Sequence, residues 1–342
     1  MRRYQRARLG TAALIAVLCA TQATAASAAT SYAELRTLAG GTSNRAFSVN
    51  QLGVVVGDAA TPAGENHAVQ WSRGGEATDL GTLPGDTSST AFSVNSSDGT
   101  VVGRSIGTVE RAVRWDRGGK AVQLPGLPGV AKTRAYSVND SRVAVGFSVT
   151  PDGNWHALRW SADAKMTELP ALPGDVSTGA TWINNLGVAV GASSTTEGRN
   201  RAVRWGTDGK VTELPALPGH QDSAATAIND QGVMVGGSGV SAESPTQAVM
   251  WTRNGVPREL PTFPGDTASY ALALGNNGCA VGYSVTPAGQ HRPVIWTPDG
   301  TVSELTTGVA GNGDPYSVQN GTVVGVVTPT GQTSRAGIWR RS

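Results

Sequence analysis

Four residues with proton-transferring side chains occupy one repeated position, directly after a Pro-Gly pair. Three are acids and one is a histidine: Asp86, Asp175, Asp266 and His220. Hydrolysis of a glycosidic bond requires two carboxyl groups on either side of one cleft, so these acids are candidates for a shared binding or catalytic site. An Asp after Pro-Gly is also a common turn residue that bonds its own backbone. The sequence leaves both interpretations open.

Two tryptophans stand outside the regular spacing of the other seven and are candidate binding residues. Trp155 lies in a variable stretch, "SVTPDGNW" (148–155). Trp182 takes a position where the other repeats have a small side chain, namely Ser48, Ser93, Ser137, Ala227, Ala273 and Ser317. A ring in such a position either fills a local gap or projects into a central channel as a stacking platform. Both alternatives remain open for Trp182.

Other catalytic signatures are missing from the sequence. No His/Cys cluster has the spacing of metal ligands, no Gly-x-Ser-x-Gly elbow occurs, and no EF-hand loop is present. We therefore expect no metal and no cofactor. Removing the four leader arginines from the 27 basic residues leaves 23 against 25 acids, a nearly neutral chain. A nearly neutral chain lacks the excess of basic side chains that is typical of nucleic-acid-binding proteins.

The elements that must position these residues come from an internal repeat. A segment of the type Ala-x-x-Val-Asn is followed by an apolar run ending in Gly, a segment ending in Trp, and a Leu-Pro segment. The seven tryptophans of the repeat are Trp71, Trp115, Trp160, Trp205, Trp251, Trp296 and Trp339, spaced 43–46 residues apart. A fixed period of this length indicates a repeat architecture. A Trp at one place in every unit is a packing device.

Each segment has the pattern of a β-strand, and no stretch after the leader has the period of an amphipathic helix. Asn-x-x-Gly between the first two segments is typical of a tight turn. The prolines of the Leu-Pro segment cannot donate to a ladder, so this strand must lie at a sheet edge. The first strand, with small side chains suited to a narrowing centre, is then innermost, and the Leu-Pro strand is outermost.

Seven units of four antiparallel strands predict an all-β fold, a seven-bladed β-propeller. The chain begins its repeats with a fourth-strand segment, "YAELRTLAGG" (32–41), and ends them with a third-strand segment at Trp339. The N-terminal strand is therefore expected to complete the last blade and close the ring. A parallel β-helix is the alternative, but it does not explain why the surplus strand and the missing strand match.

The first 28 residues are typical of a secretory signal peptide. Four arginines precede an apolar run from Leu9 to Ala20, which is too short to span a membrane as a mature helix. Cleavage is expected after Ala25 or Ala28, leaving 29–342 as a single secreted domain without a membrane span. The twin arginines leave the general secretory and twin-arginine export routes both open.

The repeat also resembles a known family. Leu-x-x-Leu-Pro-Gly, Ala-x-x-Val-Asn-x-x-Gly, Val-Val-Gly and His-Ala-x-x-Trp are similar to the HAF repeat of extracellular repeat proteins, and the resemblance covers essentially all of 29–342. The namesake His-Ala stands at His67-Ala68 and His156-Ala157, whereas other units have Arg or Gln in place of His. The resemblance implies an extracellular repeat protein and carries over no activity.

These observations favour a secreted, monomeric binding protein without enzymatic activity. The loops between second and third strands and the crossovers between units share one face, which we call the loop face, and loops on a rigid scaffold are the usual place for binding. An extracellular polysaccharide or a protein is the expected partner. The alternative is an extracellular glycosidase or polysaccharide lyase that uses Asp175 and a second acid in the channel.

Overall fold

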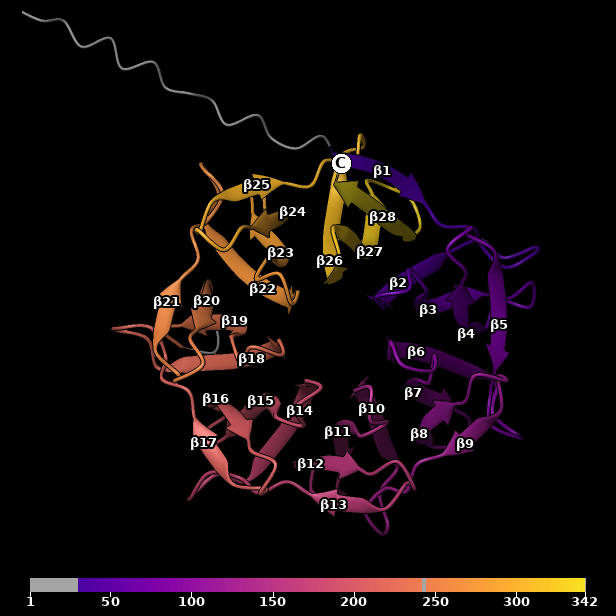
Figure 1. Cartoon of the computed structure of the whole chain (residues 1–342), viewed down its shortest axis with the longest axis horizontal. Coiled ribbons are helices and arrows are strands. Elements are labelled where there is room, and N and C mark those ends of the chain that lie inside the picture. The colour runs from indigo at the N-terminus through magenta and orange to yellow at the C-terminus, as the bar shows by residue number, and fades with distance from the viewer. Residues whose placement is uncertain (1–29, 242–243, 342) are drawn as a thin grey trace, which may run out of the picture.

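The computed structural model describes residues 30–241 and 244–341. The predicted signal peptide lies outside the described residues. Within them the chain is all-β, with twenty-eight strands and no helix, as the repeat predicts. Figure 1 shows the strands arranged in groups around a common centre.

Each group has four hydrogen-bonded strands, and we call such a group a four-stranded set. The strands of a set are consecutive in the chain except in the last set, which β1 completes. Five sets are separate sheets, and the sets β6–β9 and β10–β13 are joined by a single parallel pair, Lys132 with Glu110. The first strands are β2 (Asn44–Val49), β6 (Ser88–Val94), β10 (Lys132–Val138), β14 (Ser177–Ile183), β18 (Asp222–Ile228), β22 (Ala268–Leu274) and β26 (Gly311–Gln319). The second strands are β3 (Val55–Ala60), β7 (Val101–Ile106), β11 (Ala144–Val149), β15 (Ala189–Ser194), β19 (Met234–Gly239), β23 (Ala280–Val285) and β27 (Thr322–Pro329).

The third and fourth strands complete the sets. The third strands are β4 (Asn66–Trp71), β8 (Glu110–Trp115), β12 (Trp155–Trp160), β16 (Asn200–Trp205), β20 (Gln247–Trp251), β24 (His291–Trp296) and β28 (Arg335–Arg341). The fourth strands are β5 (Ala77–Gly81), β9 (Ala121–Gln123), β13 (Met166–Glu168), β17 (Val211–Glu213), β21 (Pro257–Glu259) and β25 (Val302–Glu304). The N-terminal β1 (Thr30–Glu34) pairs with β28, giving the sheet order β1-β28-β27-β26.

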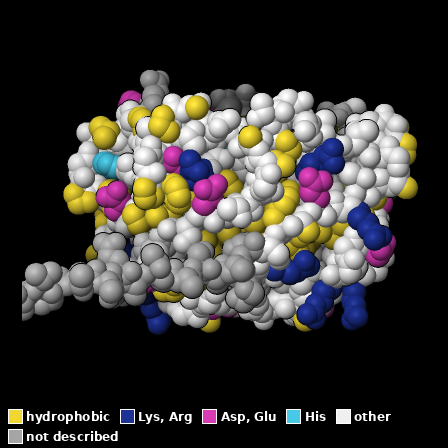
Figure 2. All heavy atoms as spheres, turned by 90° about the horizontal axis from the view of Figure 1, so that it is seen from above, with side chains coloured by type: hydrophobic (Ala, Val, Ile, Leu, Met, Phe, Trp, Pro, Cys, Tyr) yellow, Lys and Arg dark blue, Asp and Glu magenta, His cyan; other side chains and the backbone are white. Residues whose placement is uncertain are grey.

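The predicted order of strands within a set is confirmed. The first strands lie nearest the centre and the fourth strands lie outermost (Figure 1). Five fourth strands are only three residues long because a Leu-Pro or equivalent segment follows and leaves the ladder. Figure 2 shows acidic and basic side chains side by side over the rim, interleaved with apolar ones.

The repeated tryptophans are the core, as the sequence predicts. All seven are fully buried. Six indole Nε1–H groups donate to a carbonyl in the Leu-Pro segment of the preceding set or its equivalent, as in Trp205 to Pro170 O at 2.8 Å. Each of these six rings therefore fills the space between two sheets and links the sheets by a hydrogen bond. In the part of the chain that the structure describes, the Trp115 indole nitrogen lacks an acceptor, and the carbonyl of Gly81 at the corresponding position accepts from Ser89 Oγ at 2.7 Å instead.

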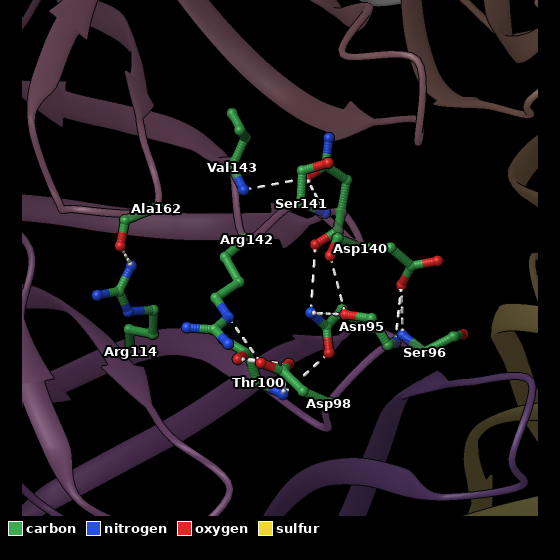
Figure 3. A network of polar contacts seen from close by, with 12 residues as sticks. Asn95, Ser96, Asp98, Thr100, Arg114, Asp140, Ser141, Arg142, Val143 and Ala162 are labelled. Carbon is green, nitrogen blue, oxygen red and sulfur yellow. Dashed lines mark hydrogen bonds and ion pairs between the residues drawn. The ribbon is translucent and has the colours of Figure 1, made fainter.

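The Asn-x-x-Gly turns gather on the face opposite the loop face, which we call the turn face. Asn139 Oδ1 accepts the N–H groups of Ser141 and Val143, at 3.1 and 3.0 Å, and its Nδ2 donates to Asn184 O at 3.0 Å. Figure 3 shows the equivalent turn one set earlier, where Asn95 Oδ1 accepts the N–H group of Thr100 at 2.9 Å and Ser96 N–H donates to Asp140 Oδ1 at 2.7 Å. The asparagines therefore close their own turns and tie each set to the next.

The first and last sets also contact each other. Val49 N on β2 donates to Ser317 Oγ on β26 at 3.2 Å. One hydrophobic cluster contains Ala46 and Trp71 from the first set together with Val324 and Ile338 from the last. Packing between these two sets is thus the same kind of contact that joins the other neighbours.

Candidate functional site

The acids after Pro-Gly are buried in ion pairs. The side chains of Asp86, Asp175 and Asp266 are at most 2 % exposed. Each pairs with the arginine at the start of the third strand of its own set: Arg111, Arg201 and Arg292. The hydrogen bond that Arg201 donates to Asp175 raises the pKa of Arg201, and the hydrogen bond to Asp266 raises the pKa of Arg292 in the same way. The structure does not bring these carboxylates together, because each fastens a different crossover.

His220 occupies the same position with different partners. Its Nδ1 lies 3.1 Å from Ser238 Oγ, and the third strand of its set begins with Gln247 where the sets of Asp86, Asp175 and Asp266 have Arg. The loss of the acid is therefore accompanied by the loss of the arginine. His220 is held within its own set.

Trp182 lies on the turn face. It packs against two hydrophobic clusters, one containing Val190 and the other Ala227. It also borders a cavity of about 90 Å³ that is lined by residues of every first strand and of the turns that follow, among them Asn184 and Asp230. Trp182 thus fills a gap between sets and faces the centre as well, but it lies on the face opposite Trp155.

Trp155 lies on the loop face and is the first residue of β12, a strand position rather than the loop position expected from the sequence. Its indole stacks on Phe147, with ring centroids 4.1 Å apart and planes 15° apart. Its backbone N–H donates to Ser177 Oγ at 3.1 Å. Although the ring is held on one side, Trp155 is 45 % exposed. An exposed, fixed indole is a preformed stacking surface.

A cavity of about 430 Å³ opens beside Trp155. Its walls include small side chains of two neighbouring sets, Gly179, Thr181, Ala192, Ala224 and Thr226, with Tyr270 also bordering it. A Cβ added at Gly179 would meet only the Trp155 ring, at 3.6 Å. The cavity therefore exists because two adjacent sets have small residues at their inner positions.

The other sets have aromatic residues at the corresponding positions. From Trp155 the rings continue through Phe147, Tyr136, Phe92 and Phe47 to Tyr316, and we call this run the aromatic arc. Successive centroids are 4.1, 5.5, 4.9, 5.7 and 5.4 Å apart. Such spacings are those of contacting aromatic pairs. The arc crosses four sets and leads to the cavity.

Arginines lie over the arc. Arg45 is 5.4 Å from the Phe47 centroid, Arg104 is 5.7 Å from Phe92, and Arg134 is 5.9 Å from Phe147. These are cation–π distances. The arc is therefore a run of half-buried rings edged with guanidinium groups, in which Phe147 is buried and Trp155 is exposed.

A second ring cluster lies near the Tyr316 end. Tyr283 stacks on His291 with centroids 3.9 Å apart, and His291 Nδ1 lies 2.7 Å from Asp314. Burial raises the pKa of Tyr283 above its ordinary value. Among the described residues there is no group of three or more side chains arranged to hold a metal ion. No helix of the described chain is long and apolar enough to cross a membrane.

Most residues of the arc and cavity were missed at the sequence level, although a signal existed. They occupy the positions on either side of the repeated Ala of the first strand, and the position after the repeated Gly of the second. These positions differ from unit to unit: Phe47, Phe92, Tyr136, Thr181, Thr226, Leu272 and Tyr316 form one such column. Variation inside a regular repeat marks the residues that the fold does not require.

The sequence matches no protein-family model and no curated protein. Solved structures are similar in fold. A streptogramin B lyase is 15% identical with a TM-score of 0.57, over 92% of this chain and 98% of that one. The β-propeller domain of the Trilobed protease from Pyrococcus furiosus is 11% identical with a TM-score of 0.57, over 87% and 93%. The extracellular domain of a one-component system from B. thetaiotaomicron is 9% identical with a TM-score of 0.56, over 89% of this chain and 39% of that one. At these identities the likeness concerns the fold alone, and it shows that the chain is a β-propeller protein.

Proposed function

We propose that the chain is a secreted, non-enzymatic binding protein whose seven four-stranded sets are the blades of a closed β-propeller. The pairing of β1 with β28 and the packing of the first set on the last support the closed ring. The leader, the resemblance to HAF repeats and the extracellular propeller neighbour support secretion. The ligand is a polysaccharide bound on the loop face along the aromatic arc.

The observation that carries this proposal is Trp155. A side chain this apolar is rarely left exposed on a rigid support, and Trp155 is 45 % exposed while stacked on Phe147. The neighbouring cavity of about 430 Å³ offers depth, and uncharged, mostly small side chains line it. Sugar rings present apolar C–H faces with hydroxyl edges, which suit a ring surface bordered by Asn154, Ser177 and Asn200.

The competing proposal is a glycosidase or lyase that uses Asp175. A catalytic carboxylate must reach its substrate and exchange a proton with it. Asp175 is instead fully buried, with Arg201 Nη2 2.6 Å away and Ser193 Oγ donating to it at 2.6 Å. A carboxylate so enclosed is held as a charged structural partner. This arrangement favours binding over turnover by that acid.

The test is binding of purified 29–342 to a panel of soluble and insoluble polysaccharides. Trp155→Ala removes the stacking surface, and Gly179→Leu fills the cavity without a backbone conformation that requires glycine. Leu186→Ala is the matched control, because Leu186 is 60 % exposed on the turn face. We expect binding to fall at least tenfold in the first two variants and to be unchanged in the control.

Two results would contradict the proposal. Equal binding by wild type, Trp155→Ala and Gly179→Leu would place the ligand elsewhere. Release of reducing ends or unsaturated products by wild type, abolished by Asp175→Asn, would establish the enzyme instead. Circular dichroism of each variant shows that the fold is retained.

A further inference from the structure

The charges along the aromatic arc are unequal. Over the middle of the arc stand three guanidinium groups, Arg45, Arg104 and Arg134, but only two carboxylates, Asp58 and Glu110. Asp314 lies at the Tyr316 end, where it bonds His291, and burial together with the charge of Asp314 raises the pKa of Tyr316. The middle of the arc therefore carries one positive charge in excess.

Two of the arginines are satisfied by the carboxylates. Arg45 binds Asp58 through Nε at 2.9 Å and Nη2 at 2.6 Å, in a two-pronged geometry, and this bonding raises the pKa of Arg45. Arg134 engages both oxygens of Glu110, through Nε and through Nη2. Paired guanidinium and carboxylate groups of this kind are fixed in place.

Arg104 is the arginine left over. Its ion contact is Nη1 to Glu110 Oε1 at 3.5 Å, and that oxygen already accepts from Arg134. The Arg104 Nε is buried, and no partner for it exists among the described residues. The side chain is 20 % exposed and lies over Phe92. Because Nε is buried, a ligand can reach only the exposed part of the guanidinium group, and a partly desolvated cation attracts an anion more strongly than one in water.

We infer that the polysaccharide bound by the arc is acidic, and that Arg104 takes the carboxylate of a uronic acid residue. This inference rests on the proposed function. A guanidinium group binds a carboxylate through two parallel N–H donors, and a uronic acid has its carboxylate on the same ring that stacks. An arc of rings edged with guanidinium groups matches a chain of such sugars. Neutral polysaccharides would leave Arg104 without its partner.

The test compares each acidic chain with its own neutral form. Polygalacturonate, alginate and hyaluronan are measured against wild type before and after chemical reduction of their carboxylates to alcohols. For at least one of the three we expect reduction to weaken binding tenfold or more, because hydrogen bonds to charged groups are the stronger class. Binding of the acidic form should also weaken as salt increases.

Arg104→Gln tests the residue itself. It should weaken binding of the acidic chain about as much as carboxyl reduction does, with little further effect on the reduced chain. Arg142→Gln is the control, since Arg142 lies on the turn face, exposed and 2.6 Å from Asp98. Arg104→Lys keeps the charge but not the two donors, and should recover binding only in part.

The outcomes separate this inference from the proposed function. Trp155-dependent binding that is equal for acidic and reduced chains would refute the acidic ligand and leave the proposed function standing. Acidic binding that Arg104→Gln does not weaken would refute the role of Arg104. If the three acidic chains fail to bind while another polysaccharide of the panel binds through Trp155, the inference alone fails. If no polysaccharide of the panel binds, or binding is independent of Trp155, the inference and the proposed function both fail.

Discussion

The ion pair of Asp175 and Arg201 permits a quantitative test of the structural role given to the acids. The two substitutions are expected to cost different amounts. Arg201→Gln leaves a fully buried carboxylate with Ser193 as its remaining side-chain donor. Leaving a buried charge without its partner lowers the free energy of unfolding by about 4 kcal/mol. Asp175→Asn leaves an arginine that is 20 % exposed and 3.4 Å from Glu213, so we expect a loss of about 2 kcal/mol.

The double variant provides the coupling energy. Asp175→Asn with Arg201→Gln combines the two single substitutions, and His220 with Gln247 shows that the repeat accepts this position without the ion pair. It removes both charges together, so we expect a total loss of about 3 kcal/mol, well below the sum of the single losses. Urea unfolding followed by circular dichroism gives the midpoint and the slope for each variant.

The control is an exposed pair. Arg36 and Glu76 are 2.6 Å apart with side chains about 70 % exposed, so Arg36→Gln should change stability by less than about 0.5 kcal/mol. Single losses that simply add, or a loss below about 1 kcal/mol for Arg201→Gln, would refute the reasoning, because a buried pair must show coupling.

Three further predictions concern the core and the tyrosines. Trp205→Phe should cost about 1 to 2 kcal/mol more than Trp115→Phe in urea unfolding, since only the first breaks an indole hydrogen bond and strands a carbonyl. Equal losses would contradict that account. Trp182→Ser should cost about 3 kcal/mol yet leave polysaccharide binding unchanged, because Trp182 lies on the turn face; lost binding in a folded variant would move the site. Burial raises the pKa of Tyr270 and of Tyr316 from 10.0 to about 12, so stability should fall as the pH rises from 10 to 12. Replacing both tyrosines by Phe should reduce the loss of stability between pH 10 and 12, and an unchanged pH profile would contradict the role given to these tyrosines.

The strands and their order could be predicted because the sequence pattern of each strand recurs in successive units. The Asn turns, the buried tryptophans and the edge position of the Leu-Pro strand all follow from local chemistry and were confirmed. The prediction of small side chains at the centre is confirmed only in part. Ser48, Ser93 and Ser317 border the central cavity, but a bulge between Ala91 and Ser93 breaks the alternation of the strand. Ala91 packs between sheets, while Phe92 joins the arc.

The acids could not be placed because their partners lie on another strand. Nothing next to Asp175 in the sequence indicates that Arg201, 26 residues later, will neutralise it. A comparison among units contained the information, since Asp accompanies Arg in three units and His accompanies Gln in a fourth. The arc was missed for a similar reason: contacts such as Phe47 with Tyr316 join opposite parts of the chain.

The pairing of β1 with β28 also determines the order in which the molecule can be completed. Thr30 pairs with Arg341, so this sheet cannot form until both strands have been synthesised. Contacts of such long sequence separation are made late and slowly. Until then the outer edge of β28 has unpaired backbone groups, which invite pairing with another molecule. The molecule is therefore open to intermolecular strand pairing only until β1 has paired with β28.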